Sequence, residues 1–433
     1  MSEANHEGMR ESMLALKEKS GVLVRHTGQD FASFLRWVLL GCIVGVIAGG
    51  AGTVFYFTMR TVTDLRLAHG WLLWLLPLGG LFIVFLYRAC KVTKAQGTNL
   101  VIVAVRSTEP VPLKMAPLIF ISTAVTHLFG GSAGREGAAL QLGGSLGYQV
   151  GKIFRVDEKD LHIMTMCGMA ASFSALFGTP ATSAVFVLEV VTVGIMYYAA
   201  LVPCAVASIV GYCVARFFGA SPTAFAVAGI PAESSALPFL RVALLAALCA
   251  LVSIVFCIAM RGISAVYEKY VPNQYARAAV GGVLILLLAL LFGKDCLGMG
   301  GDVMQRSFSG NARPEIFFLK ILFTAVTLGA GFRGGEIVPA FFVGSTFGCV
   351  AGRLIGLNPS FGAAIGFLSV FCGVTNCPLT SFVLSMEVFG SRGAIYYLLA
   401  AGISYMLSGY TGIYTQQKIP YAKDRAVYIG GNR

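Results

Sequence analysis

Two glutamates in this chain stand where glycine-rich turns lead into apolar stretches. Glu136 lies within Gly134–Gly137, and Glu336 lies within Gly335–Pro339. Glycines permit close backbone approach, and each apolar stretch predicts a helix that starts beside its glutamate. Unpaired N–H groups and the positive end of the helix dipole favour an anion at such a start. A carboxylate and a small free anion would compete for that position, and protonation of the carboxylate would vacate it.

The first start combines Glu136 with Gly134, Arg135 and Gly137 in the tetrapeptide Gly-Arg-Glu-Gly. Two interpretations fit this loop. In one, Glu136 gates an anion path and couples anion movement to protons. In the other, Glu136 only caps the helix and pairs with Arg135. The tetrapeptide by itself does not decide between them.

The second start places Pro339 early in its helix, where proline fits well. The backbone N–H groups of Ile337 and Val338 are then available to an anion. Glu336 is a second carboxylate in the same kind of place. The alternative is an ion pair between Glu336 and Arg333, three residues earlier.

A third candidate loop is Gln96–Leu100, which leads into another apolar run. The Thr98 hydroxyl can donate to an anion, and Asn99 stands beside it. Taken alone, the loop is typical of an ordinary turn or a helix N-cap.

The elements that must position these loops occur twice. The two glycine turns repeat at an offset of 201 residues, and Thr179–Val190 returns as Cys377–Val388 at an offset of 198. The second repeat carries Glu189 and Glu387 inside apolar segments, where a carboxylate is costly and suggests a function. We favour the alternative that both are inherited packing features with satisfied hydrogen bonds. Duplicated halves are typical of transporters.

We predict an all-α multi-pass membrane protein with two related halves and broken or re-entrant helices. Hydrophobic residues make up 57% of the chain and charged residues 12%, whereas soluble domains average about 25% charged residues. Several apolar runs approach or exceed the roughly 17–25 residues that span a bilayer, and others are shorter and interrupted. The predicted boundaries are a cytosolic N-terminal segment 1–33, a first half 34–218, a linker 219–238, a second half 239–415 and a short cytosolic tail 416–433.

The remaining composition excludes several classes of function. The net charge of +12 fits positively charged cytosolic loops and contact with lipid, and no dense lysine–arginine run favours nucleic acid. The 11 cysteines show no CxxC spacing and predict buried free thiols, and the 5 scattered histidines give no metal-ligand spacing. Because no nucleophile–base or metal cluster is evident, we predict neither an enzyme nor a bound cofactor or metal.

The motifs resemble, in order, those of the CLC family of chloride channels and proton-coupled antiporters. The family signatures are Gly-Ser-Gly-Ile-Pro, Gly-Arg-Glu-Gly-Pro with the gating glutamate, Gly-x-Phe-x-Pro, and a late tyrosine. The matching segments here are Gly97–Asn99, Gly134–Ala138, Gly335–Pro339 and Tyr414. The resemblance spans roughly residues 34–420. It implies that Glu136 is the gate, that the halves are inverted, that the termini are cytosolic, and that the protein is a homodimer with one pore per subunit.

Departures from those signatures resemble the fluoride branch, CLC-F, whose members export fluoride in exchange for protons. Ala138 replaces the proline of the second signature, and Glu336 replaces a usual residue of the third. Val190 stands where chloride/proton antiporters carry an internal proton-relay glutamate. In the fluoride branch a glutamate in the third loop serves the proton path, which implies that role for Glu336.

The resemblance therefore implies a secondary active transporter that exchanges fluoride for protons across a lipid bilayer, the bacterial inner (plasma) membrane. The anion would bind near the N–H groups at Glu136, Ile337 and Val338, with the Thr98 and Tyr414 hydroxyls closing the site. A chloride/proton antiporter and a passive chloride channel of the same family remain the alternatives.

Overall fold

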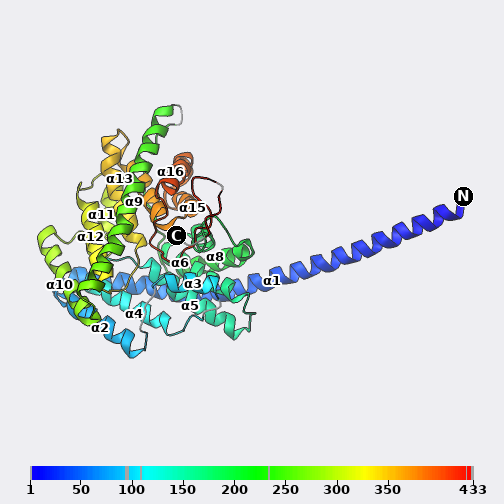
Figure 1. Ribbon diagram of the computed structural model, residues 1–433, viewed down its shortest axis with the longest axis horizontal. Helices are drawn as coiled ribbons and strands as arrows, with labels where there is room; N and C mark the ends of the chain where they lie inside the picture. Colours follow the sequence, from blue (N-terminus) through cyan, green and yellow to red (C-terminus); the bar gives the residue numbers. More distant parts are fainter. Residues whose placement is uncertain (1, 93–96, 108–109, 233–234, 426, 431–433) are drawn as a thin grey trace.

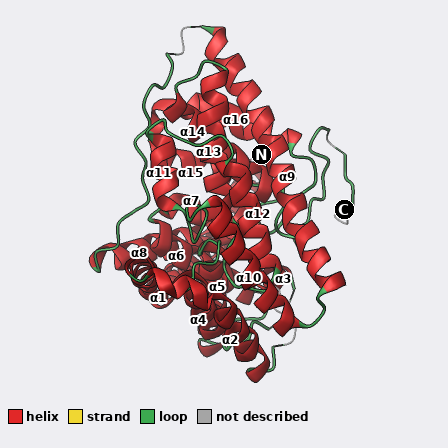
Figure 2. Ribbon diagram, turned by 90° about the vertical axis from the view of Figure 1, so that its left-hand side faces the viewer, coloured by secondary structure: helices red, strands yellow, loops and turns green. Residues whose placement is uncertain are grey.

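The computed structural model describes residues 2–92, 97–107, 110–232, 235–425 and 427–430, with side chains described from residue 30 onward. Within these ranges the chain forms sixteen α-helices and three short 3-10 helices, and its only β contacts are isolated bridges. Figure 2 shows helices joined by loops, with no strand drawn in the described part of the chain. The predicted all-α membrane fold is therefore confirmed.

The helices form two series of eight. The first series is α1 (Ser2–Ala68), α2 (Leu76–Ala89), α3 (Asn99–Arg106), α4 (Met115–Leu128), α5 (Glu136–Ile153), α6 (Leu161–Phe177), α7 (Pro180–Glu189) and α8 (Leu201–Phe217). The second series is α9 (Ala236–Tyr270), α10 (Gln274–Phe292), α11 (Gly301–Phe308), α12 (Ile316–Gly329), α13 (Ile337–Leu354), α14 (Pro359–Thr375), α15 (Pro378–Phe389) and α16 (Ala394–Leu407). The short 3-10 helices are η1 (Gly70–Leu75), η2 (Tyr198–Ala200) and η3 (Ser391–Gly393).

Corresponding helices of the two series have the same lengths in the region of the candidate site. The helices α3 and α11 each have 8 residues, α4 and α12 each have 14, α5 and α13 each have 18, and α6 and α14 each have 17. The repeat in the sequence is therefore a repeat of structure, and it places both glutamate loops at equivalent helix starts.

Within the described residues, six helical segments are long and apolar enough to cross a membrane, judged by length and composition. Further apolar helices have 10–17 residues, so the chain combines full-length and short elements, as expected. The outer faces of the long segments carry exposed apolar side chains, such as Leu251, Leu290 and Leu291. In lipid, such faces need no protein partner.

Two of the predicted boundaries lie inside helices, at position 33 and at position 238. The helix α1 runs without a break through position 33, and Figure 1 shows its N-terminal part projecting away from the bundle. Residues 219–232 lack regular secondary structure, as expected of a linker, and α9 already begins at Ala236. The exact division into halves and linker stays a prediction.

Glycine contacts fix how α5 and α13 pack against their neighbours. A Cβ added at Gly143 of α5 would overlap the Gly168 carbonyl of α6, and one at Gly344 of α13 would overlap the Gly366 carbonyl of α14. Small residues that let helix backbones approach closely are a common way to pack helices in membranes. Each half thus holds its glutamate-bearing helix against a partner helix by the same contact.

Candidate functional site

The glycine turns of the two halves pair directly with each other. Gly134 donates its N–H to the Gly335 carbonyl at 2.7 Å, and Gly335 donates to the Gly134 carbonyl at 2.8 Å, in an antiparallel bridge. A Cβ added at Gly335 would lie 2.7 Å from the Gly137 backbone nitrogen, so the approach requires glycine. Because equivalent residues pair, the halves are related here by an approximate two-fold rotation, and the starts of α5 and α13 lie side by side.

Glu136 is the first residue of α5 and is fully buried between these two helix starts. Its Oε2 accepts a hydrogen bond from the Arg135 backbone nitrogen at 2.9 Å, and the Val338 backbone N–H of α13 faces the same carboxylate. Its Oε1 has no hydrogen-bond partner among the described residues. The carboxylate therefore occupies a position where N–H groups from both halves favour negative charge.

The alternative role of Glu136, as a helix cap paired with Arg135, is only partly seen. The Arg135 Nε lies 4.0 Å from Glu136 Oε1, at the limit of an ion pair, and the guanidinium lies 5.0 Å from the centre of the Tyr56 ring. A purely structural carboxylate rarely keeps a buried oxygen without a hydrogen bond. The geometry thus favours the gate, which stays a prediction.

The second candidate helix start, that of α13, faces the region of Glu136. Ile337 and Val338 are the first two residues of α13 and are buried. Glu336 is the N-cap residue, and its side chain lines a cavity of about 180 Å³ together with Gly97 and Gln141. The two glutamates therefore differ: one carboxylate is enclosed between the helix starts, and the other borders open space.

The proposed pairing of Glu336 with Arg333 is not seen among the described residues. The Arg333 guanidinium instead lies over the Tyr87 ring, 4.7 Å from its centre, and lines the same cavity as Glu336. Both charged groups are therefore available to something that enters the cavity.

The third candidate loop touches the first. Thr98 is buried, and its Oγ1 lies 3.4 Å from the Gly137 carbonyl. The Asn99 Oδ1 accepts a hydrogen bond from the Gln416 backbone nitrogen at 3.1 Å, which ties the start of α3 to the segment after α16. Gln96 lies outside the described residues.

Tyr414, in that segment after α16, completes the group. Its hydroxyl is buried, with no hydrogen-bond partner in the part of the chain that the structure describes, and it lies within electrostatic range of both Glu136 and Glu336. The structure thus brings Thr98, Tyr414 and both glutamates into one region. An unpartnered buried hydroxyl is a donor that an incoming anion can use.

A polar network that the sequence did not reveal holds the Tyr414 segment. Asn376, with a left-handed backbone (φ 58°), donates to Gln417 Oε1 at 3.1 Å, and its Oδ1 accepts from Lys423 Nζ at 2.6 Å. Gln417 also donates to the Val190 and Thr375 carbonyls at 2.9 and 2.8 Å. Burial lowers the pKa of Lys423 to about 8. The tail after α16 is therefore anchored to both halves.

The repeated pair Glu189 and Glu387 forms reciprocal bonds between the halves. Glu189 accepts hydrogen bonds from the Leu379 and Thr380 backbone nitrogens at 3.0 and 2.7 Å. Glu387 accepts from the Ala181 and Thr182 backbone nitrogens at 2.9 and 2.8 Å. In each case the threonine hydroxyl adds a bond of 2.5 Å. These carboxylates are saturated at helix starts, which is the structural role that we favoured.

The chain matches the family described as voltage gated chloride channel over residues 79–409. It belongs to this family, CLC.

Two CLC relatives are similar along most of their length. A chloride/fluoride channel protein of Pseudomonas syringae pv. tomato is 34% identical over 397 residues, which cover 90% of this chain and 87% of the relative. The crystal structure of a CLC-type fluoride/proton antiporter is 30% identical, with a TM-score of 0.85, and covers 89% of this chain and 98% of its own. The expected CLC membership is thus confirmed, and both relatives carry fluoride in their names, as expected for the fluoride branch.

More distant CLC relatives carry other names. An H(+)/Cl(-) exchange transporter of Vibrio parahaemolyticus, ClcA, is 26% identical over 403 residues, covering 84% of this chain and 83% of the relative. A slow cyanobacterial Cl-/H+ antiporter has a TM-score of 0.76 at 18% identity, covering 88% of this chain and 96% of its own, which shows the shared CLC fold.

Three residues of this CLC site escaped the motif analysis. Gln141 donates to the Gly137 carbonyl at 3.1 Å and lines the cavity of Glu336. The His127 Nε2 lies 3.3 Å from the Gly134 carbonyl. Arg333 was considered only as a possible ion-pair partner. Helical spacing could have suggested Gln141, four residues after Gly137, and Arg333 lies in the turn before Glu336, but only the fold shows that His127 contacts the Gly134 carbonyl and that Arg333 lines the cavity.

Proposed function

We propose that this protein is a proton-coupled antiporter that exports fluoride across the cell membrane. The observation that carries the proposal is the position of the Glu136 carboxylate, enclosed between the starts of α5 and α13 with N–H groups from both helices facing it. The names of the two relatives at 34% and 30% identity, a chloride/fluoride channel protein and a fluoride/proton antiporter, support fluoride as the anion.

Glu136 and fluoride compete for one place. Deprotonated Glu136 occupies the junction between the helix starts, and protonated Glu136 leaves it to the anion. The backbone N–H groups of Ile337 and Val338, with the hydroxyls of Thr98 and Tyr414, then replace part of the hydration shell of fluoride. Rigid donors in a water-poor site do this best, and paired glycine turns make the donors rigid.

Glu336 serves the proton path in this mechanism. Its carboxylate borders a cavity, so it can exchange protons with water there. Tyr414 lies within electrostatic range of both glutamates. Protons therefore pass from the cavity to Glu336 and on to Glu136, while the anion moves the other way. No bond is made or broken in the cargo, so the protein acts as a secondary active transporter and not as an enzyme.

The assembly that accompanies this function is a homodimer with one pore in each subunit, in the bacterial inner membrane with cytosolic termini. The division at 34–218 and 239–415 makes each half contribute one glutamate-bearing helix start to the pore.

A chloride/proton antiporter is the second candidate. Thr98 retains a hydroxyl where the chloride signature has serine, and it lies against the loop of Glu136. The name of the ClcA relative, an H(+)/Cl(-) exchange transporter, supports this candidate.

Reconstitution in liposomes tests the proposal. Fluoride and chloride release are followed with ion-selective electrodes, with and without an imposed pH gradient. We expect fluoride release to outpace chloride release by far, and a proton gradient to drive fluoride uphill. Uphill chloride movement at a comparable rate would instead support the chloride/proton antiporter, and downhill movement alone would support a passive channel.

A further inference from the structure

A second cavity adjoins that of Glu336. It has a volume of about 220 Å³ and is lined from α2, α9, α10 and the α12–α13 connection. Tyr87, Leu328 and Arg333 border both cavities, so Arg333 stands between them. Among the described residues, the Arg333 side chain is thus shared by the second cavity and the cavity of Glu336.

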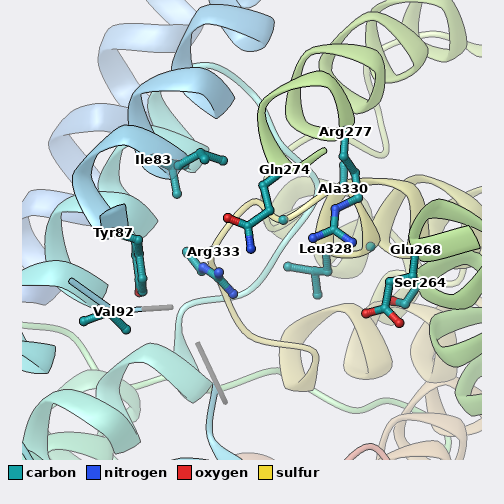
Figure 3. A pocket seen from close by; sticks show the side chains of 13 residues that line it. Ile83, Tyr87, Val92, Ser264, Glu268, Gln274, Arg277, Leu328, Ala330 and Arg333 are labelled. Atoms are coloured by element: carbon teal, nitrogen blue, oxygen red, sulfur yellow. The ribbon is translucent and has the colours of Figure 1, made fainter. Parts of the chain in front are cut away.

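Two arginines face this second cavity without a hydrogen-bonding partner for their Nε atoms. The Nε atoms of Arg277 and Arg333 are both buried, and neither has a hydrogen-bond partner among the residues that the structure describes. Figure 3 shows the two guanidinium groups pointing into the same space, with Gln274 between them and Glu268 near Arg277. The two positive charges repel each other across the cavity. A bound anion would supply the missing acceptors and relieve that repulsion.

The repeat shows that the fold does not need an arginine at position 333. The Arg333 backbone nitrogen donates to Thr126 Oγ1 at 3.2 Å, and the equivalent Ser132 backbone nitrogen donates to Thr327 Oγ1 at 3.1 Å. The loop is thus held by the same backbone bond in both halves, with a serine in one and an arginine in the other. The arginine side chain is added to a loop that is already fixed, and it points into a cavity.

We propose that the cavity between Arg277 and Arg333 is a binding site for the transported anion, a small halide that still carries water, on its way to or from the Glu336 cavity. The volume exceeds the roughly 30 Å³ of one water molecule several times, so a partly hydrated ion fits. Glu268 in the same wall keeps the binding weak, because a transported ion must leave as well as enter. The site rests on the proposed anion transport but not on the identity of the halide.

Three variants test the site. Arg333→Ser copies the residue of the equivalent loop, Arg277→Met keeps the aliphatic stem on α10, and Glu268→Gln removes the opposing charge. We expect each arginine variant to raise the half-saturating fluoride concentration for flux in liposomes by roughly threefold to tenfold, and Glu268→Gln to lower it. Arg392→Met, which removes an exposed arginine in η3, is the matched control and is expected to behave as wild type.

A second measurement separates the site from the transport function. In detergent, we expect sodium fluoride to raise the Tm of the wild type relative to sodium gluconate at equal ionic strength, and to do so less in both arginine variants. If liposomes show no anion flux but this difference persists, the transport proposal fails and the site stands. If the wild type pumps fluoride while both arginine variants match it in flux and Tm, the site is refuted. An equal shift in Arg392→Met would also refute it.

Discussion

Two pairs of carboxylates in this protein lie against helix starts, and their hydrogen bonding differs. Glu189 and Glu387 each accept two backbone N–H bonds and one hydroxyl bond from the opposite half, so the pair obeys the two-fold relation of the halves. Glu136 and Glu336 are not related by this two-fold rotation. One is enclosed with an unpartnered oxygen, and the other borders a cavity.

The offset of 201 explains this asymmetry. It places Glu336 opposite Arg135, and Ile337 opposite Glu136, although the backbone around all four is bridged symmetrically. A symmetric backbone thus supports an asymmetric set of side chains. The saturated pair joins the halves, whereas Glu136 and Glu336 are the pair for which we propose a role in transport.

The largest expected effect is that of Glu136→Gln. The glutamine cannot release or take up a proton, so we expect uphill fluoride transport to fall by about a hundredfold or more, as when a proton-transferring side chain is removed. Proton-driven fluoride uptake into liposomes measures it. Coupled transport at the wild-type rate would show that Glu136 is only a helix cap.

Glu336→Gln sharpens the contrast between the two glutamates. We expect proton movement to fall by roughly tenfold or more, with a smaller change in the fluoride concentration that half-saturates flux, because this carboxylate lies outside the enclosed position. Simultaneous recording of pH and fluoride separates the two effects. Equal loss of anion binding and proton movement would point to a structural role.

Glu189→Ala tests the saturated pair. It leaves two backbone N–H groups and the Thr380 hydroxyl without an acceptor in a buried place, and we expect a loss of about 3–5 kcal/mol in stability. Glu387→Ala should cost less, because Glu387 is only partly buried. The Tm of each variant in detergent shows which of the two is less stable. Flux per folded molecule that drops as far as in Glu136→Gln would contradict the comparison.

Asn376→Gly separates the contribution of the backbone conformation to stability from that of the side chain. It does so at another pair of positions that are equivalent in the two halves. Asn376 and Gly178 both end their helices in the left-handed conformation, with φ of 58° and 75°. Glycine keeps that conformation but removes the side chain that binds Gln417 and Lys423. We therefore expect the free energy of unfolding to fall by about 1–3 kcal/mol.

The reverse change, Gly178→Asn, serves as the control for Asn376. A Cβ there would lie 2.5 Å from Pro222, so we expect this variant to be destabilised by a clash and not by a lost network. A wild-type Tm in Asn376→Gly would mean that the hydrogen bonds of the Asn376 side chain do not stabilise the segment after α16.

The smallest expected effect concerns pH. Burial lowers the pKa of Lys423 from 10.5 to about 8, so between these values the unfolded chain binds more protons than the folded one. The stability contributed by this group therefore rises as pH increases from about 8 towards 10.5, and it is absent below 8. The difference in Tm between wild type and Lys423→Met should shift in favour of the wild type over that range. A pH-independent difference would be the contrary result.

Much of the fold and part of the candidate site followed from the sequence. The apolar runs and the offsets of 201 and 198 predicted a duplicated helical membrane protein, because lipid demands long apolar helices and equivalent residues keep equivalent places. The order of the loop motifs identified the CLC family and selected both glutamates. The boundaries between segments were harder to predict from the sequence, because α1 continues through position 33 as one helix.

Contacts between the halves were decided by tertiary structure alone. Local spacing carries no information about partners 200 or more residues away, such as the bridge between Gly134 and Gly335 or the bond from Gln416 to Asn99. The sequence determined which helix starts carry a carboxylate, because glycine, glutamate and apolar residues specify such a start locally. Only the packing of the two halves decided that Glu136 is enclosed while Glu336 borders a cavity, because burial depends on what the other half places nearby.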